Sequence, residues 1–140
     1  TLRYEAVQQS NFGRKLNGTL DSLPGFGLYK VKIKDTHVIA GHDLYGGTFR
    51  LFDKVKTRTN GLSFSFVNMN DQNAVQNAIQ KNTKMLWVET PSNPMLEVSN
   101  LSELGSFAKK HGMIAVADNT FSTPWITRPL ELGFDIVVHS

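Results

Sequence analysis

The chain has 140 residues and a mass of 15.6 kDa, a length that fits one compact domain. Hydrophobic residues make up 40% of it and charged residues 19%, so it can bury a core and is not expected to be disordered throughout. It contains no cysteine, which excludes disulfide bridges, thiolate metal sites and a cysteine nucleophile. The apolar runs are too short to cross a bilayer, and no secretory signal opens the sequence. We therefore expect a soluble, cytoplasmic protein without a membrane partner.

The net charge of +3 comes from the start of the chain. Residues 1–36 contain six basic and three acidic residues, whereas the two kinds balance in the remainder. So small an excess, without interleaved aromatic residues, does not indicate a nucleic-acid partner. Within this segment, only Leu28 to Ile33 alternates in the manner of a half-buried or edge strand. We expect residues 1–36 to form an atypical basic leader, poorly ordered or contributing an edge strand, ahead of a domain over 37–140.

Short apolar strands alternate with helical segments from residue 37 onward. Strands are expected at 37–40, 62–67, 85–88, 113–117 and 134–138. Helices are expected at 46–59, 71–80 and 100–111, with a short helical piece at 129–132. Asp71 and Asn100 suit N-caps, and Glu103 completes a capping-box pattern with Asn100. The alternation favours right-handed β-α-β units, and so an α/β fold with a mostly parallel sheet and flanking helices.

Polar segments follow four of these strands, at the point where each strand ends. They are Tyr-Gly-Gly-Thr at 45–48, Glu-Thr-Pro-Ser-Asn-Pro at 89–94, Asp-Asn-Thr-Phe at 118–121 and His-Ser at 139–140. Parallel α/β sheets bind ligands beyond the carboxyl ends of their strands. We therefore expect one edge to present an aromatic ring, an amide, a carboxylate and a hydroxyl, which a flat anionic cofactor could use. The four histidines lack metal-ligand spacing, so no metal site is expected.

These four segments, in this order, resemble the consecutive signatures of the Cys/Met-metabolism enzymes that use pyridoxal 5′-phosphate. The family includes cystathionine γ-synthase, cystathionine γ-lyase and methionine γ-lyase, and the resemblance covers residues 37–140. It implies the fold type I architecture of pyridoxal-phosphate-dependent transferases, with a partial cofactor domain over 37–140. It also implies a small sulfur amino acid as substrate and a homo-oligomeric assembly, dimer or tetramer, for the intact enzyme.

The resemblance implies a role for each matching residue. Asp118 would pair with the pyridine nitrogen of the cofactor and keep it protonated, so that the ring draws electrons from the substrate α-carbon. Tyr45 would stack on the ring and take part in proton transfer, which makes it the catalytic candidate. Asn93 would hydrogen-bond the ring hydroxyl.

The remaining matches concern the phosphate and the substrate. Ser140 would hold the phosphate through its hydroxyl, and Thr120 would lie beside the cofactor. Arg50 matches an arginine that lines the substrate region of the family. Glu89 opens the second segment and would support the site, with no chemistry of its own assigned.

The chain departs from the family pattern at both ends. The lysine that bonds the cofactor covalently lies just beyond the position of Ser140, where this chain stops. The family's phosphate-loop glycines and Tyr-x-Arg segment are not found in residues 1–34. We therefore expect a central fragment of a transsulfuration carbon–sulfur lyase or γ-synthase, inactive and poorly soluble as this chain alone. The alternatives are a non-catalytic binding protein that retains the sheet, and a Rossmann-like nucleotide-binding domain, although no G-x-G-x-x-G fingerprint is present.

Overall fold

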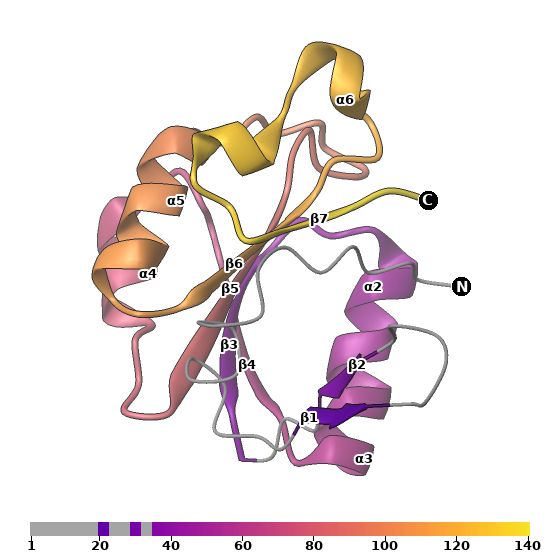
Figure 1. The fold of residues 1–140 in the computed structure, drawn as a ribbon, viewed down its shortest axis with the longest axis vertical. Helices are drawn as coiled ribbons and strands as arrows, with labels where there is room; N and C mark the ends of the chain where they lie inside the picture. The colour runs from indigo at the N-terminus through magenta and orange to yellow at the C-terminus, as the bar shows by residue number, and fades with distance from the viewer. Residues whose placement is uncertain (1–19, 23–28, 32–34) are drawn as a thin grey trace.

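Five parallel strands form the central sheet of the computed structural model, which describes residues 20–22, 29–31 and 35–140 (Figure 1). In chain order they are β3 (His37–Gly41), β4 (Ser63–Val67), β5 (Thr83–Glu89), β6 (Ile114–Asp118) and β7 (Ile136–Val138). Their spatial order is β4-β3-β5-β6-β7, and every neighbouring pair is parallel. The predicted α/β class with a parallel sheet is confirmed.

One continuous helical segment packs on β3 and β4. It consists of α2 (Gly46–Arg50), the π-helical η1 (Leu51–Lys56) and α3 (Thr57–Asn60), and it ends at Gly61 with a φ of 63°. Phe52 is buried beneath it and stacks on Phe64 of β4, with 4.8 Å between the ring centroids. Phe49 and Val55, three residues to either side of Phe52, are 38% and 44% exposed. The wider π-helical turn rotates residues three apart onto different faces.

Two helices cover the other face of the sheet, α4 (Gln72–Asn77) and α5 (Leu101–Lys110). As predicted, Asn100 caps α5 by accepting the N–H of Glu103 at 3.3 Å, and Asp71 caps α4 by accepting a backbone N–H of its first turn at 3.0 Å. The α4 helix is shorter than the expected range 71–80. It stops early because the hydroxyl of Thr83 accepts the N–H of Gln80 at 2.7 Å, which closes a turn into β5.

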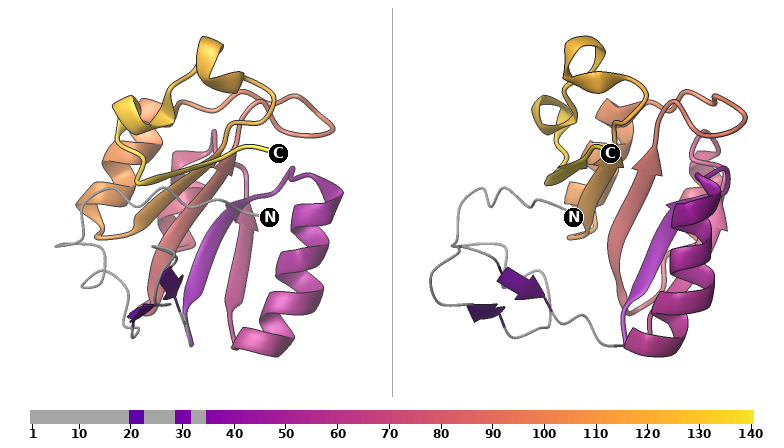
Figure 2. Two further views of the ribbon diagram at one scale, coloured as in Figure 1. Left: turned by 45° about the vertical axis from the view of Figure 1, so that its right-hand side comes forward. Right: turned by 90° about the vertical axis from the view of Figure 1, so that its right-hand side faces the viewer.

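The strand order reverses direction at β3. From β3 the chain passes to β4 at one edge, and then crosses back to β5 on the other side of β3. Because β-α-β crossovers are right-handed, the reversal places successive helices on opposite faces. Figure 2 shows α2, η1 and α3 on one face and α4 and α5 on the other. The connections after β3 and β5 therefore diverge, and open α/β sheets bind ligands in the crevice that such a divergence leaves.

The core lies on both faces of β3, β5 and β6. Leu86 and Val88 of β5 are fully buried with Ala115 of β6, against Leu104 and Ala108 of α5. On the other face, Phe52 packs edge-on to Trp87, with 5.1 Å between the ring centroids. Strands that are covered on both sides read as continuous apolar runs rather than as alternations, which is the pattern that the sequence showed.

The remaining elements lie at the two ends of the described chain. α6 (Thr123–Ile126) was not predicted, because a four-residue helix is too short to show a periodic pattern. The expected helical piece at 129–132 is η2 (Pro129–Leu132), which ends at Gly133 with a φ of 92°. β1 (Leu20–Ser22) pairs antiparallel with β2 (Tyr29–Val31), which lies within the strand predicted at Leu28–Ile33. The rest of the predicted leader, at 1–19, 23–28 and 32–34, lies outside the described residues. Within the described ranges, no helix has the length and apolar character that a membrane span requires.

Candidate functional site

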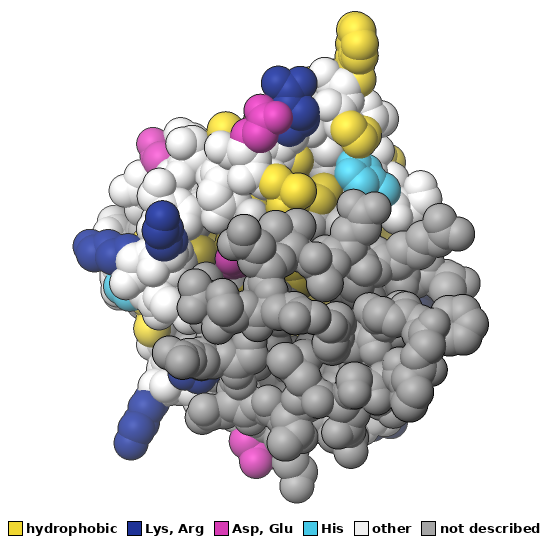
Figure 3. Space-filling model, in the orientation of Figure 1, with side chains coloured by type: hydrophobic (Ala, Val, Ile, Leu, Met, Phe, Trp, Pro, Cys, Tyr) yellow, Lys and Arg dark blue, Asp and Glu magenta, His cyan; other side chains and the backbone are white. Residues whose placement is uncertain are grey.

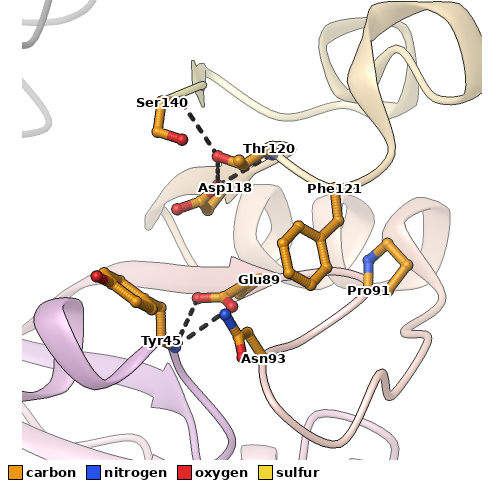
Figure 4. Close-up of a pocket in the computed structure, with 8 residues that line it drawn as sticks. All are labelled: Tyr45, Glu89, Pro91, Asn93, Asp118, Thr120, Phe121 and Ser140. Carbon is orange, nitrogen blue, oxygen red and sulfur yellow. Dashed lines mark hydrogen bonds between the residues drawn. The ribbon is translucent and has the colours of Figure 1, made fainter.

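A cavity of about 240 Å³ opens at the carboxyl edge of the sheet, where the ends of β3, β5, β6 and β7 come together (Figure 4). Its lining residues are Tyr45, Glu89, Pro91, Asn93, Asp118, Thr120, Phe121 and Ser140. Since the strands are parallel, their carboxyl ends meet at one edge, and side chains that are far apart in the sequence become neighbours.

Five of the residues singled out in the sequence line this cavity: Tyr45, Asn93, Asp118, Thr120 and Ser140.

Arg50 is the exception, because it does not line the cavity and is exposed on α2. Its guanidinium nevertheless turns back along the helix, since a Cβ added at Gly46 would lie 3.9 Å from its Nη1. Phe121 also lines the cavity, although the sequence predicts no role for it, and it predicts only a supporting role for Glu89. Phe121 and Glu89 both belong to polar segments that contain a predicted site residue. Their place in these segments is the sequence feature that could have identified them as lining residues.

Asp118 is held by a short chain of hydrogen bonds at the end of β6. Its Oδ1 accepts the backbone N–H of Thr120 at 3.0 Å and the hydroxyl of the same residue at 2.6 Å. The Thr120 hydroxyl oxygen in turn accepts the N–H of Ser140 at 3.2 Å. Figure 4 shows these three residues in a row along one side of the cavity. Within the described part of the chain, Oδ2 of Asp118 takes no hydrogen bond, so this oxygen can accept one from a ligand.

Tyr45 lies on the side of the cavity formed by the β3–α2 connection. Tyr45 is 56% exposed, and its ring folds over the backbone of Gly47. A Cβ added at Gly47 would stand 2.5 Å from Cε1 of this ring, a distance that real Cβ atoms do not adopt. Glycine at position 47 is therefore required for the observed position of the phenol, which leaves a ring face open for stacking.

Glu89 is buried at the end of β5 and occupies the position paired with Asp118 on β6. Its carboxylate accepts the backbone N–H of Tyr45, at 3.0 Å to Oε2 and 3.3 Å to Oε1. Burial raises the pKa of Glu89, the N–H of Tyr45 opposes that rise, and the charge of Asp118 adds to it. Both charged residues of the described lining are thus acidic, which favours a ligand group that carries a proton.

The loop after β5 places Asn93, and Asp43 organises this loop. The carboxylate of Asp43 accepts the hydroxyl of Ser92 at 2.5 Å and the N–H of Met95 at 2.9 Å. Ser92 is buried, and its oxygen also accepts the N–H of Glu97 at 2.9 Å. Asn93 lies between these anchored positions with its side chain at the cavity.

These groups can hold a flat heteroaromatic ring that bears a hydroxyl and a phosphate. The free oxygen of Asp118 suits a protonated ring nitrogen, and the amide of Asn93 suits a ring hydroxyl. The ring of Tyr45 offers a stacking surface, and the hydroxyl of Ser140 suits a phosphate. The donors and acceptors present therefore fit pyridoxal 5′-phosphate.

The histidines of the described residues are not gathered at the cavity. His37 is fully buried in β3, where its ring nitrogens hydrogen-bond the hydroxyls of Thr83 at 2.8 Å and Ser65 at 2.9 Å. Burial lowers the pKa of His37. Across the described ranges, no three histidine, aspartate or glutamate side chains are placed to hold a metal ion.

The chain belongs to the family of Cys/Met metabolism PLP-dependent enzymes, whose sequence model matches residues 28–140. The predicted family membership is confirmed, and the cofactor of this family is pyridoxal 5′-phosphate, as expected.

Several individual relatives of the chain carry the names of cystathionine enzymes. Over 104 residues, the chain is 58% identical to a cystathionine beta-lyase of Coxiella burnetii and 48% identical to a probable cystathionine gamma-synthase of Herpetosiphon aurantiacus. These matches cover 74% of this chain but only 27% and 32% of the two relatives, so the chain spans about a third of their length or less.

Solved structures agree with this placement. The crystal structure of cystathionine gamma-lyase from Lactobacillus plantarum complexed with L-serine matches 76% of this chain and 28% of its own, with a TM-score of 0.74 and 42% identity. The crystal structure of metB from Corynebacterium glutamicum matches the same share of both chains, with a TM-score of 0.72 and 38% identity. The predicted fold type I architecture is thereby confirmed.

Proposed function

We propose that this chain is the central part of the cofactor domain of a transsulfuration enzyme, a carbon–sulfur lyase or γ-synthase that acts on a sulfur amino acid such as cystathionine. The observation that carries the proposal is that Tyr45, Asn93, Asp118, Thr120 and Ser140 line the same cavity. The names of the relatives include both β-lyase and γ-synthase, so the proposal stays at the level of transsulfuration chemistry.

Asp118 is the residue that holds a proton on the ring nitrogen. Its Oδ1 is already bonded twice to Thr120, which leaves Oδ2 to accept from the protonated nitrogen. Once bound, pyridoxal phosphate supplies an electron sink for the charge that develops on the substrate α-carbon. The negative charge of Asp118 keeps the ring nitrogen protonated.

Tyr45 and Asn93 orient the ring. The phenol of Tyr45 stacks on one face, where stacking contributes on the order of 1 kcal/mol beyond the area buried. Its hydroxyl is also the group that we propose moves a proton near the substrate α-carbon. The amide of Asn93 hydrogen-bonds the ring hydroxyl and so selects one rotation of the ring in its plane.

Thr120 and Ser140 act at the phosphate side. The hydroxyl of Thr120 links Asp118 to the backbone of Ser140, so its part is to hold these two residues in register. The Ser140 hydroxyl is left for the phosphate. Arg50 is proposed to line the substrate region, and its guanidinium, which turns back toward the start of α2, supports this role.

The intact protein is proposed to be a homo-oligomer. Large apolar side chains are exposed near α6, with Trp125 at 91% and Ile126 at 74%, and Figure 3 shows hydrophobic atoms protruding at this end of the molecule. Surfaces of this kind commonly mark contacts with another protein. Its cytoplasmic location remains a prediction from the sequence.

The 140 residues alone are proposed to bind the cofactor without turning over substrate. Within the described residues, no lysine lines the cavity, so the lining there provides no amine for a covalent bond to the aldehyde. We expect no release of ammonia from L-cystathionine when the chain is supplied with pyridoxal 5′-phosphate. Ammonia release by these residues would contradict the proposed inactivity.

Binding of 4-deoxypyridoxine 5′-phosphate tests the proposed site directly. This probe keeps the ring, hydroxyl and phosphate of the cofactor but carries a methyl group in place of the aldehyde, so its binding does not depend on a lysine. Calorimetric titration should show binding to the chain and an affinity at least about tenfold weaker in Asp118→Asn. The matched control is Asp71→Asn, because asparagine also caps α4 far from the cavity. Equal affinity of Asp118→Asn and the original chain would refute the assignment of Asp118.

A further inference from the structure

Two carboxylates cross the crevice between β3 and β5 in opposite directions. Glu89, at the end of β5, accepts the N–H of Tyr45 in the β3–α2 connection, at 3.0 and 3.3 Å. Asp43, in that connection, accepts the hydroxyl of Ser92 at 2.5 Å and the N–H of Met95 at 2.9 Å in the loop after β5. Each segment therefore provides the acid that holds the other.

The backbone hydrogen bonds of the sheet do not hold the β3–α2 connection against the loop after β5. The register between β3 and β5 ends with Ala40 opposite Trp87, so Tyr45 and Asn93 both lie well past the last paired residues. The two segments then leave the sheet on diverging paths. Side-chain hydrogen bonds must therefore fix Tyr45 relative to Asn93.

The bonds between the two segments are strong and partly sheltered. Glu89 is 9% exposed and Ser92 is 3% exposed, so both lie largely out of water. Hydrogen bonds to a charged acceptor are about twice as strong as neutral ones. The backbone N–H of Asn93 also stabilises the charged form of Glu89, which places this one carboxylate against both segments.

We propose that Glu89 and Asp43 form a reciprocal latch whose function is to set the spacing between the ring of Tyr45 and the amide of Asn93, and hence the fit of a flat heteroaromatic ring between them. Glu89 and Asp43 are positioning residues, since they act through Tyr45 and Asn93. The latch itself is a property of the folded chain. The identity of the ring that this spacing accommodates rests on the proposed function.

Amide hydrogen exchange, measured by NMR on the whole 140-residue chain, tests the latch without any ligand. The amide of Tyr45 should be protected in the original chain, lose protection by at least about tenfold in Glu89→Ala, and keep it in Glu89→Gln, whose side-chain oxygen still accepts. The amide of Met95 should respond in the same way to Asp43→Ala and Asp43→Asn. Asp71→Ala removes a carboxylate cap elsewhere and should change neither amide. Unchanged protection of Tyr45 in Glu89→Ala would refute the latch.

Affinity for 4-deoxypyridoxine 5′-phosphate tests the function of the latch formed by Glu89 and Asp43. Glu89→Ala should bind the probe about tenfold more weakly, and Glu89→Gln should restore affinity to within about twofold. Because Glu89 acts through Tyr45 and Asn93, Glu89→Ala should weaken binding much less in a Tyr45→Ala background than in the original chain. Additive losses, or a Gln variant as weak as the Ala variant, would overturn the positioning role. If the original chain fails to bind the probe while the exchange pattern holds, the proposed function fails and the latch stands.

Discussion

Glu89 and Asp118 occupy paired positions on β5 and β6, so their carboxylates lie side by side at the carboxyl edge of the sheet. Residues paired across neighbouring parallel strands point to the same face. Both side chains line the cavity, and the charge of Asp118 helps to raise the pKa of Glu89. A protonated ring nitrogen placed between the phenol of Tyr45 and these acids would relieve the repulsion.

Glu89 should make the stability of the chain depend on pH. Its pKa is raised, chiefly by burial, so the folded chain keeps a proton that the unfolded chain releases above pH 4.5. The free energy of unfolding contributed by this group therefore falls as the pH rises from 4.5 through the raised pKa. Glu89→Gln should be more stable than the original chain at neutral pH, with a flatter pH dependence, in urea denaturation. Glu131→Gln, at an exposed surface pair, serves as the control.

His37 should make the free energy of unfolding depend on pH in the opposite direction. Burial lowers its pKa, so below pH 6.5 the unfolded chain takes up a proton that the folded chain does not. This part of the stability is fully present above 6.5 and is lost as the pH falls through the lowered pKa. His37→Gln, which cannot titrate, should remove this loss in urea denaturation on the acid side. An unchanged acid dependence would show that His37 is not its source.

Gly47→Ala should weaken binding without weakening the fold. The added Cβ meets the ring of Tyr45 at 2.5 Å, and an exposed ring can swing away at little cost. We expect 4-deoxypyridoxine 5′-phosphate to bind about five- to tenfold more weakly, with stability changed by no more than about 0.5 kcal/mol. Gly46→Ala is the matched control, because its Cβ would meet only Arg50 at 3.9 Å. Equal affinities of the two variants would contradict the role assigned to Gly47.

Gly105→Ala should destabilise the fold, although alanine is the better helix former. At an ordinary helical position, this change stabilises by up to about 1 kcal/mol. Here the Cβ would lie 2.4 Å from the carbonyl oxygen of Leu132, where η2 packs on α5. We expect a net loss of about 1–3 kcal/mol in urea denaturation. Ser106→Ala, at the exposed next position of α5, should change the stability by about 0.5 kcal/mol or less.

Local signals in the sequence predicted most of the elements and the candidate residues of the site. The cap residues Asp71 and Asn100 lie at the predicted helix starts, and the apolar runs lie in the strands of the sheet. The polar segments after these strands supplied five lining residues of the cavity, because parallel strands bring their carboxyl ends together whatever the length of chain between them. Fold class, family and cofactor followed from these features.

Tertiary structure alone decided how the site is held. No local pattern shows that β3 lies between β4 and β5, that Glu89 reaches the N–H of Tyr45, or that Asp43 anchors the loop carrying Asn93. The same holds for Arg50, which lies on the predicted helix but outside the cavity lining. These relationships depend on hydrogen bonds and packing between residues that are dozens of positions apart. Such contacts form only once the strand order is set, so a local pattern carries no trace of them.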